Sequence, residues 1–262
     1  MLAQSKVYDV VVVGGGHAGI EAALAVSRMG GKALLLTINL DTIGQMSCNP
    51  AVGGLAKGHI AREIDALGGE MARITDLTGI QFRMLNRRKG PAVQAPRAQC
   101  DKKAYQYRLK WTCEQTAGLD CIQGEVSGLI VDSGGVRGVR TTLGVVFRAR
   151  SVVLTTGTFL RGLMHIGLQQ FPGGRSGEAA AIELSHSLRE LGFELGRLKT
   201  GTPPRISRRG IDFSRMDRQP GEEPVPLFGH WHADLFHVEQ AEPHSRGSRP
   251  SGYPRGSILE RI

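Results

Sequence analysis

Aromatic residues make up only 5% of this chain, and several features of other protein classes are missing altogether. No stretch approaches the ~20 consecutive apolar residues that a membrane-spanning helix needs. The four cysteines form no CxxC pair and show no metal-ligand spacing with histidine, so we expect no metal site and thiols kept reduced. Only seven residues precede the first expected strand, which leaves no room for a signal or transit peptide. We therefore expect a cytoplasmic protein without a membrane anchor.

Glycine and positive charge, by contrast, are plentiful. The 36 glycines among 262 residues suit an α/β protein with many loops and close backbone approaches, and the length allows one large domain or two. The formal net charge of +9 favours an anionic partner such as nucleic acid. A basic surface that only aids solubility is the alternative interpretation.

The most informative motif is the glycine turn at residues 14–19, which reads GGGHAG. It follows the apolar run 8–13 and opens an Ala- and Leu-rich segment that ends near Arg28, so the order is strand, turn and helix. In such a unit Gly14 permits the tight turn, Gly16 lets the backbone approach a pyrophosphate, and Gly19 lets the helix pack on the strand. The helix N-terminus then offers free N–H groups to the phosphates. The motif predicts dinucleotide binding.

The residue that would hold the ribose is not evident. A second apolar strand is expected at residues 32–37, and an acidic residue is usual where that strand ends. This chain continues with Thr37, Ile38, Asn39, Leu40 and Asp41. Either Asn39 or Asp41 could replace the usual acid, and the sequence does not choose between them.

The order of the later elements favours FAD over NAD. Helices are expected at 59–67, 100–116 and 177–191, the last capped by Ser176, and a short strand at 121–124. Three strands at 128–131, 136–141 and 145–148 form a meander, with a hairpin turn at 132–135, and a buried parallel strand follows at 151–157. This pattern resembles the FAD-binding Rossmann-like domain of the glutathione reductase type, an α/β fold in which the meander is a regular part.

Five longer blocks are far more specific than the glycine turn. They read DTIGQMSCNP (41–50), NRRKGPAV (86–93), LTTGTFL (154–160), HIGL (165–168) and GRLKTGTPPRI (196–206). Together with the opening GGGHAG they resemble the MnmG (GidA) family of tRNA uridine 5-carboxymethylaminomethyl modification enzymes. The resemblance runs from about Tyr8 to Phe228.

This resemblance implies an activity and its partners. The family adds a carboxymethylaminomethyl or aminomethyl group to C5 of the wobble uridine of tRNA. It uses FAD, NADH as reductant and methylene-tetrahydrofolate as carbon donor, and it works with an MnmE-type GTPase as a homodimer within a heterotetramer. Two alternatives are an FAD- or RNA-binding remnant without catalysis and, less well supported, a folate- and FAD-dependent tRNA uridine methyltransferase, whose relatives lack the SCNP and KTGTPPR blocks.

The resemblance also assigns site residues. The FAD pyrophosphate loop comprises Gly14, Gly15, Gly16, His17, Ala18 and Gly19. Val126 matches a backbone position on the adenine side, and Ala181 falls where relatives often carry a serine. Cys48 matches a cysteine that acts at uridine C6 or as a general acid or base. From the residues alone, Cys48 is either this reactive loop thiol or a small buried hydrophobe.

Basic residues near the expected flavin mouth form a second group. We expect Arg87, Arg88, Lys89 and Arg97 to contact tRNA, because a splayed-out uridine needs its phosphates held nearby. Lys199 and Arg205 join this group from a Gly- and Pro-rich loop. A solvated surface is the alternative for the run at 87–89. The turn at 172–175 is either a simple loop or a second anion contact.

The sequence suggests three parts. We expect an incomplete FAD-binding domain at 1–200, the start of an inserted substrate domain at 201–228, and a disordered tail unlike the family at 229–262. The family members are more than twice as long. Either a truncation or frameshift or a true short form explains this, and we expect the chain alone to be inactive.

Overall fold

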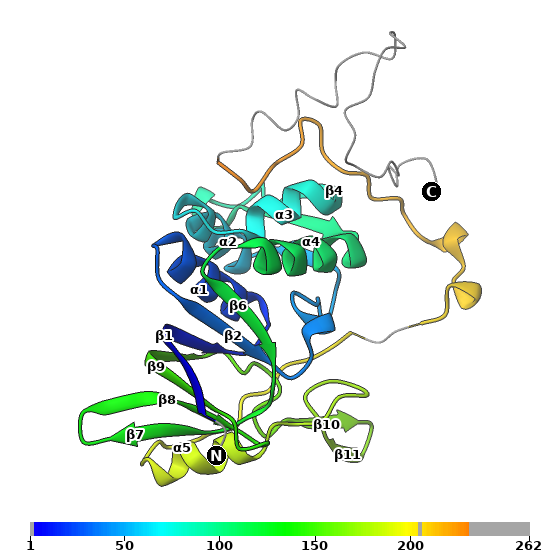
Figure 1. Ribbon diagram of the computed structural model, residues 1–262. Helices are drawn as coiled ribbons and strands as arrows, with labels where there is room; N and C mark the ends of the chain where they lie inside the picture. Colours follow the sequence, from blue (N-terminus) through cyan, green and yellow to red (C-terminus); the bar gives the residue numbers. More distant parts are fainter. Residues whose placement is uncertain (1–2, 204–205, 231–262) are drawn as a thin grey trace, which may run out of the picture. The chain divides into compact units, whose positions relative to one another are not determined.

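A six-stranded sheet with the order β6-β2-β1-β9-β8-β7 organises the computed structural model, which describes residues 3–203 and 206–230 (Figure 1). Its strands are β1 (Ala3–Val13), β2 (Ala33–Thr37), β6 (Leu119–Gln123), β7 (Val126–Asp132), β8 (Gly135–Thr141) and β9 (Val146–Leu154). The four strands β6, β2, β1 and β9 run parallel, whereas β7 and β8 are antiparallel and form the meander. The expected α/β fold with a β-meander is confirmed.

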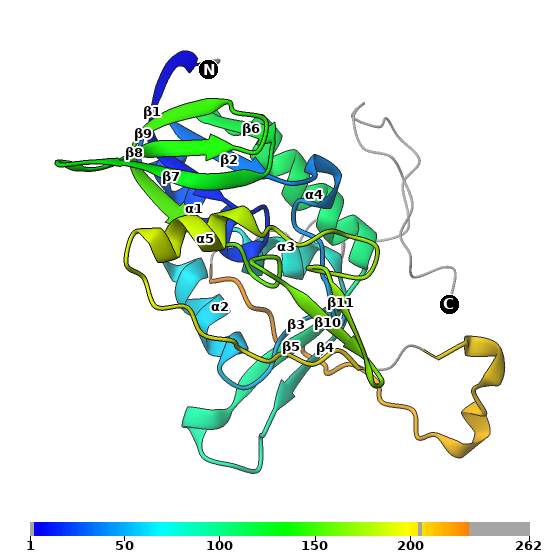
Figure 2. The ribbon, with the colours of Figure 1, turned by 90° about the horizontal axis from the view of Figure 1, so that it is seen from below.

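Alternating side chains of the central strands pack on both faces of this sheet. Val12 and Leu35 face helix α1 (His17–Arg28) and helix α4 (Lys102–Gln115), where Leu24 and Leu109 are fully buried. On the opposite face, Val11 and Val13 pack in a second core with residues of the meander, and helix α5 (Glu183–Glu190) covers the meander (Figure 2). Such burial on both faces explains why these strands read as continuous apolar runs.

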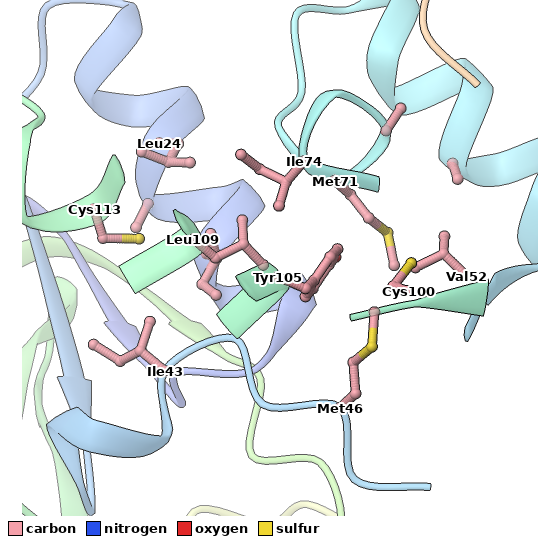
Figure 3. Packing of buried hydrophobic residues seen from close by; sticks show 14 of the residues in the cluster. Leu24, Ile43, Met46, Val52, Met71, Ile74, Cys100, Tyr105, Leu109 and Cys113 are labelled. Atoms are coloured by element: carbon pink, nitrogen blue, oxygen red, sulfur yellow. The ribbon is translucent and has the colours of Figure 1, made fainter. Parts of the chain in front are cut away.

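A smaller group of elements packs against α1 and α4 and extends the hydrophobic core that these helices form with β1 and β2. It comprises the helices α2 (Lys57–Ala66) and α3 (Met71–Thr78) and an antiparallel sheet of order β3-β5-β4, with β3 at Ala51–Gly53, β4 at Gly79–Leu85 and β5 at Ala95–Cys100. Tyr105 lies among the core residues that join the two parts, near Met46, Met71 and Cys100 (Figure 3). The small sheet and α3 were not expected from the sequence.

Two remaining segments complete the described chain. A hairpin of β10 (Leu163–Ile166) and β11 (Gln169–Pro172) follows β9 in the chain. Short 3-10 turns lie at η1 (Leu40–Thr42), η2 (Pro91–Val93), η3 (Arg208–Gly210) and η4 (Phe213–Arg215). The chain up to His230 forms one compact unit. Most of the expected tail at 229–262, from residue 231 on, lies outside the described residues.

Four expected elements are corrected. The strands predicted at 145–148 and 151–157 are one strand, β9, because it pairs antiparallel with β8 at its start and parallel with β1 farther on. The helix predicted from residue 177 begins only at Glu183, since Ala181 forms a bridge with Leu160 and Ser176 caps nothing. The helix predicted from residue 100 begins at Lys102, because the Asp101 side chain accepts the first free N–H groups.

Candidate functional site

The glycine turn between β1 and α1 is fixed by contacts that leave no room for side chains. A Cβ on Gly14, whose φ is +114°, would lie 2.4 Å from the carbonyl oxygen of Thr155, and one on Gly19 would lie 1.9 Å from the carbonyl oxygen of Gly14. Thr155, at the end of β9, donates its hydroxyl to the carbonyl of Val13 at 2.9 Å. These approaches explain why only glycine suits both positions.

Gly16 differs from its neighbours, because a Cβ added there would meet no atom within 4 Å. Its backbone is extended, with φ −78° and ψ 179°, so other residues could adopt it. Gly16 caps α1 and lines a cavity, so the open space lies at a helix N-terminus, where the first N–H groups have no partner within the helix. This cradle fits a phosphate group.

The cavity beside Gly16 has a volume of about 260 Å³. The sequence-predicted positions Gly14, Gly15, Gly16, Val126 and Ala181 line it, together with the end of β2 and residues 155–159 after β9. It lies outside the carboxyl ends of the parallel strands, which is where open α/β sheets bind ligands. His17, Ala18 and Gly19 are not part of this lining.

Both candidates for the missing ribose contact have other roles. The Asn39 side chain accepts the N–H of Asp41 at 2.8 Å and so caps η1, and the Asp41 carboxylate pairs with Lys110 at 2.8 Å. A carboxylate that the sequence analysis missed, Glu125, lines the cavity from the turn between β6 and β7. Burial raises the pKa of Glu125, with Glu183 adding to the effect.

A second cavity has a volume of about 430 Å³. Cys48 lines it, as do His17, Lys57 and Arg97. Gln45 and Ser47 line both cavities, so the two are adjacent. A molecule bound with its phosphates at Gly16 could therefore reach from the first cavity to the second.

His17 contributes a neutral ring to this second cavity. Burial, together with a smaller effect of the nearby Lys57 ammonium, lowers the pKa of His17 to about 4. The ring lies 5.6 Å from that of Tyr105, centroid to centroid, and its Nε2 atom is buried with no hydrogen-bond partner among the described residues. The His17 side chain therefore packs near Tyr105 and lines the Cys48 cavity.

Cys48 also contacts the KTGTPPR block from far along the chain. Its sulfur lies 3.7 Å from the carbonyl oxygen of Gly201, to which it donates, and 3.6 Å from the hydroxyl of Thr202. The other three cysteines differ, because burial raises the pKa of Cys100 and Cys113 to about 12 and that of Cys121 to about 11. Their thiols stay protonated and unreactive at neutral pH.

The expected tRNA-contacting residues are spread over two places. Arg87, Arg88 and Lys89 are exposed in the turn after β4, where Arg87 forms an ion pair with Glu222. Arg97, on β5, instead lines the Cys48 cavity. Lys199 is exposed, and Arg205 lies outside the described residues.

The turn at 172–175 also reaches the first cavity. Arg175 lines it but is paired with Glu178 through contacts of 2.7 and 2.8 Å, and it donates to the hydroxyl of Ser47 at 3.1 Å. Within residues 3–203 and 206–230, no cluster of three His, Cys, Asp or Glu side chains could hold a metal, and no helix there is long and apolar enough to span a membrane.

The family model for glucose inhibited division protein A matches residues 9–246. The chain belongs to this GidA family. The resemblance drawn from the sequence blocks is thereby confirmed, and the matched region includes the glycine turn, Cys48 and the contacting loop at Gly201 and Thr202.

Relatives of known name agree with the GidA assignment. The chain is 60% identical over 223 residues to the tRNA uridine 5-carboxymethylaminomethyl modification enzyme MnmG of Geobacter sulfurreducens, covering 85% of this chain and 36% of the relative. It is 58% identical over 218 residues to the MnmG of Protochlamydia amoebophila, covering 83% and 35%. The chain thus spans about a third of the length of the curated relatives it matches.

Solved structures give the same result. The Aquifex aeolicus GidA structure superposes with a TM-score of 0.82 at 57% identity, covering 86% of this chain and 37% of that chain. The GidA-related protein of Thermus thermophilus matches less well, with a TM-score of 0.53 at 26% identity over 71% of this chain and 69% of that chain. The fold of the described residues is that of GidA.

Proposed function

We propose that this chain provides the FAD-binding and catalytic-cysteine part of an enzyme that modifies C5 of the wobble uridine in tRNA. The observation that carries the proposal is the pair of adjacent cavities, one at the Gly16 cradle and the other at Cys48, which share Gln45 and Ser47. The reaction class comes from the relative that is 60% identical, a tRNA uridine 5-carboxymethylaminomethyl modification enzyme.

The first cavity would hold the adenine and pyrophosphate parts of FAD. The pyrophosphate would lie against Gly16 and the α1 N-terminus, with Val126 and Ala181 forming walls of the same cavity. Glu125 is the acidic side chain placed to accept a ribose hydroxyl. When bound, FAD supplies the oxidation–reduction chemistry of the reaction.

The second cavity would receive the uridine. Cys48 would act on the base, at C6 or as a general acid or base, and Thr202 lies close enough to orient the thiol. A pyrimidine base must leave its stack to reach such a thiol, and the exposed cations Arg87, Arg88 and Lys89 would hold the flanking phosphates. NADH as reductant and methylene-tetrahydrofolate as carbon donor complete the proposed reaction.

The rest of the proposed assembly follows the family. We expect an MnmE-type GTPase as partner and a homodimer within a heterotetramer. The chain covers only about a third of its relatives' length, so the test uses a full-length chimera. Residues 1–228 replace the corresponding part of the Geobacter sulfurreducens MnmG, and the chimera is expressed in bacteria that lack their own enzyme.

Nucleoside analysis of the tRNA then decides the proposal. We expect the C5-modified wobble uridine to return with the chimera and to be lost again with Cys48→Ser. An FAD-containing chimera that leaves the uridine unmodified would favour a cofactor-binding role without catalysis. A C5-methyl group in place of the expected product would point to the methyltransferase alternative.

A further inference from the structure

The Cys48 cavity contains two cations that the uridine chemistry described above does not use. Lys57, in the first turn of α2, and Arg97, on β5, both line it. The lining has no aspartate or glutamate, and within the described ranges neither cation takes part in an ion pair. Two unneutralised cations in one cavity are unfavourable unless an anion joins them.

One hydrogen bond and the charges that act on Lys57 indicate that these two cavity-lining cations lie together at Cys48. The Lys57 ammonium donates to the carbonyl oxygen of Ala51 at 3.1 Å, which holds it beside β3. The pKa of Lys57 lies below its usual value, mainly because of desolvation, and the charges of Cys100, Cys48 and Arg97 also act on it. The ammonium is therefore within electrostatic range of both the reactive thiol and the second cation.

His17 adds a neutral polar group to the same cavity. Its Nε2 atom is buried and has no hydrogen-bond partner among the described residues. A buried polar atom without a partner is costly, and a bound polar ligand is one way to satisfy it. The cavity therefore combines two cations, a hydrogen-bonding imidazole and a thiol.

Resting on the proposed function, we propose that Lys57 and Arg97 form the subsite for the carboxylate that is attached to the uridine. The product group named for the relatives, carboxymethylaminomethyl, consists of a methylene joined to the nitrogen of a glycine unit. The group ends in a carboxylate, whose carbon lies two bonds from that nitrogen. A guanidinium and an ammonium beside Cys48 are suited to bind it and to hold the amine near the reacting carbon.

This assignment separates Arg97 from the other basic residues. Arg87, Arg88 and Lys89 are exposed in the turn after β4, whereas Arg97 lines the same cavity as Cys48. A tRNA phosphate or the flavin itself is also anionic, so the experiment must tell these sources apart.

The first test probes the subsite on this chain, saturated with FAD. Iodoacetate and iodoacetamide alkylate thiols alike, but only iodoacetate carries a carboxylate of the length of glycine. We expect the rate ratio of iodoacetate to iodoacetamide at Cys48 to exceed that of N-acetylcysteine by about tenfold, the worth of one charge-assisted hydrogen bond. Arg97→Gln and Lys57→Gln should remove most of this preference, and Arg97→Lys should retain part of it.

Controls distinguish the anion. Arg88→Gln, which changes an exposed arginine, should leave the Cys48 rate ratio as it is. Glycine should slow the alkylation by iodoacetate, whereas inorganic phosphate at the same ionic strength should not. A ratio equal to that of N-acetylcysteine, or loss of bound FAD in Arg97→Gln and Lys57→Gln without a change in the ratio, would overturn the carboxylate subsite and indicate a flavin contact.

The second test uses the chimera described above. Arg97→Gln should shift the tRNA products from the carboxymethylaminomethyl to the aminomethyl nucleoside, because only the first of these groups carries a carboxylate for Arg97 to bind. An unchanged product ratio would contradict the subsite, because both products depend equally on tRNA and flavin binding. If the unsubstituted chimera modifies no tRNA, the proposed function fails, and the alkylation result still decides the subsite.

Discussion

The sulfur of Cys48 lies 3.6 Å from the hydroxyl of Thr202, 154 residues later in the chain. Two of the sequence blocks that signal the family, SCNP and KTGTPPR, therefore meet at one point. The SCNP block and the described part of the second block, residues 199–203, have no regular secondary structure, so their juxtaposition depends on the fold around them. The contact explains why both blocks belong to one site rather than to two separate loops.

The first prediction concerns the reactivity of the cysteines. Iodoacetamide should label Cys48 in the folded protein much faster than Cys100 or Cys113, because Cys48 lines a cavity whereas burial raises the pKa of the other two to about 12. Mass spectrometry of peptides after timed alkylation measures the rates. Equal labelling of Cys48 and Cys100 would mean that the cavity is closed to the reagent.

Substitutions of the same cysteines should separate function from stability. Cys48→Ser should change the unfolding free energy by less than about 0.5 kcal/mol, as is usual away from the core, yet abolish uridine modification by the chimera. Cys100→Ser places a hydroxyl where the residue is only 2% exposed, and should cost about 1–3 kcal/mol. Denaturant unfolding and nucleoside analysis are the two measurements. Modification that survives in Cys48→Ser would make this thiol dispensable.

The glycine turn offers a matched pair of substitutions. Gly16→Val should leave the fold intact, because an added Cβ meets nothing within 4 Å, but should weaken FAD binding by at least about tenfold, since the side chain fills the phosphate cradle. Gly19→Val should instead unfold the turn, because its Cβ would lie 1.9 Å from the Gly14 carbonyl oxygen. Flavin fluorescence titration and thermal denaturation measure the two effects. Unchanged FAD affinity in a folded Gly16→Val protein would remove the pyrophosphate from this position.

The parts of the fold and site that depend on neighbouring residues could be predicted from the sequence. The turn at Gly14 to Gly19 and the hairpin at 132–135 depend on residues next to one another, so their chemistry is visible in the sequence. The small sheet β3-β5-β4 could not be predicted, since β5 contains Pro96 and Arg97 and its pairing with β3 and β4 joins distant segments. The Lys57 and Arg97 cluster depends on that sheet.

The candidates for the ribose contact also differ in whether the sequence could identify them. The sequence directed attention to Asn39 and Asp41, because the usual ribose contact follows the second strand. In the structure Asn39 caps the 3-10 turn η1 and Asp41 forms an ion pair, whereas Glu125 reaches the cavity from the turn between β6 and β7. No spacing rule in the sequence links Glu125 to Gly16.

The anchor of the last described segment can be tested through Phe228. Its side chain is fully buried in the hydrophobic core that includes residues of α1 and α4. The Asp76 carboxylate accepts hydrogen bonds from the N–H groups of Phe228 and Gly229 at 3.0 and 2.8 Å. Phe228→Ala should therefore cost about 3–5 kcal/mol of unfolding free energy. The control Phe213→Ala changes a phenylalanine that is 59% exposed and should cost less than about 0.5 kcal/mol. Equal effects would show that the segment 225–230 is not part of the core.

The last prediction is a pH dependence due to His17. Burial lowers the pKa of the folded His17 to about 4 from the ordinary 6.5, so the unfolded chain binds a proton more readily between these values. Stability from this group is complete above pH 6.5 and is lost as the pH falls toward 4, by up to about 3 kcal/mol.

The variant His17→Phe isolates this effect, because phenylalanine keeps a ring against Tyr105 and does not titrate. Urea unfolding of both proteins at several pH values between 7 and 4 gives the difference in unfolding free energy. We expect the wild type to lose stability relative to His17→Phe as the pH falls, because carboxylates that titrate in the same range are common to both and cancel. Parallel profiles would mean that His17 is accessible to protons in the folded protein, and the neutral imidazole assigned to the Cys48 cavity would then be charged at mildly acidic pH.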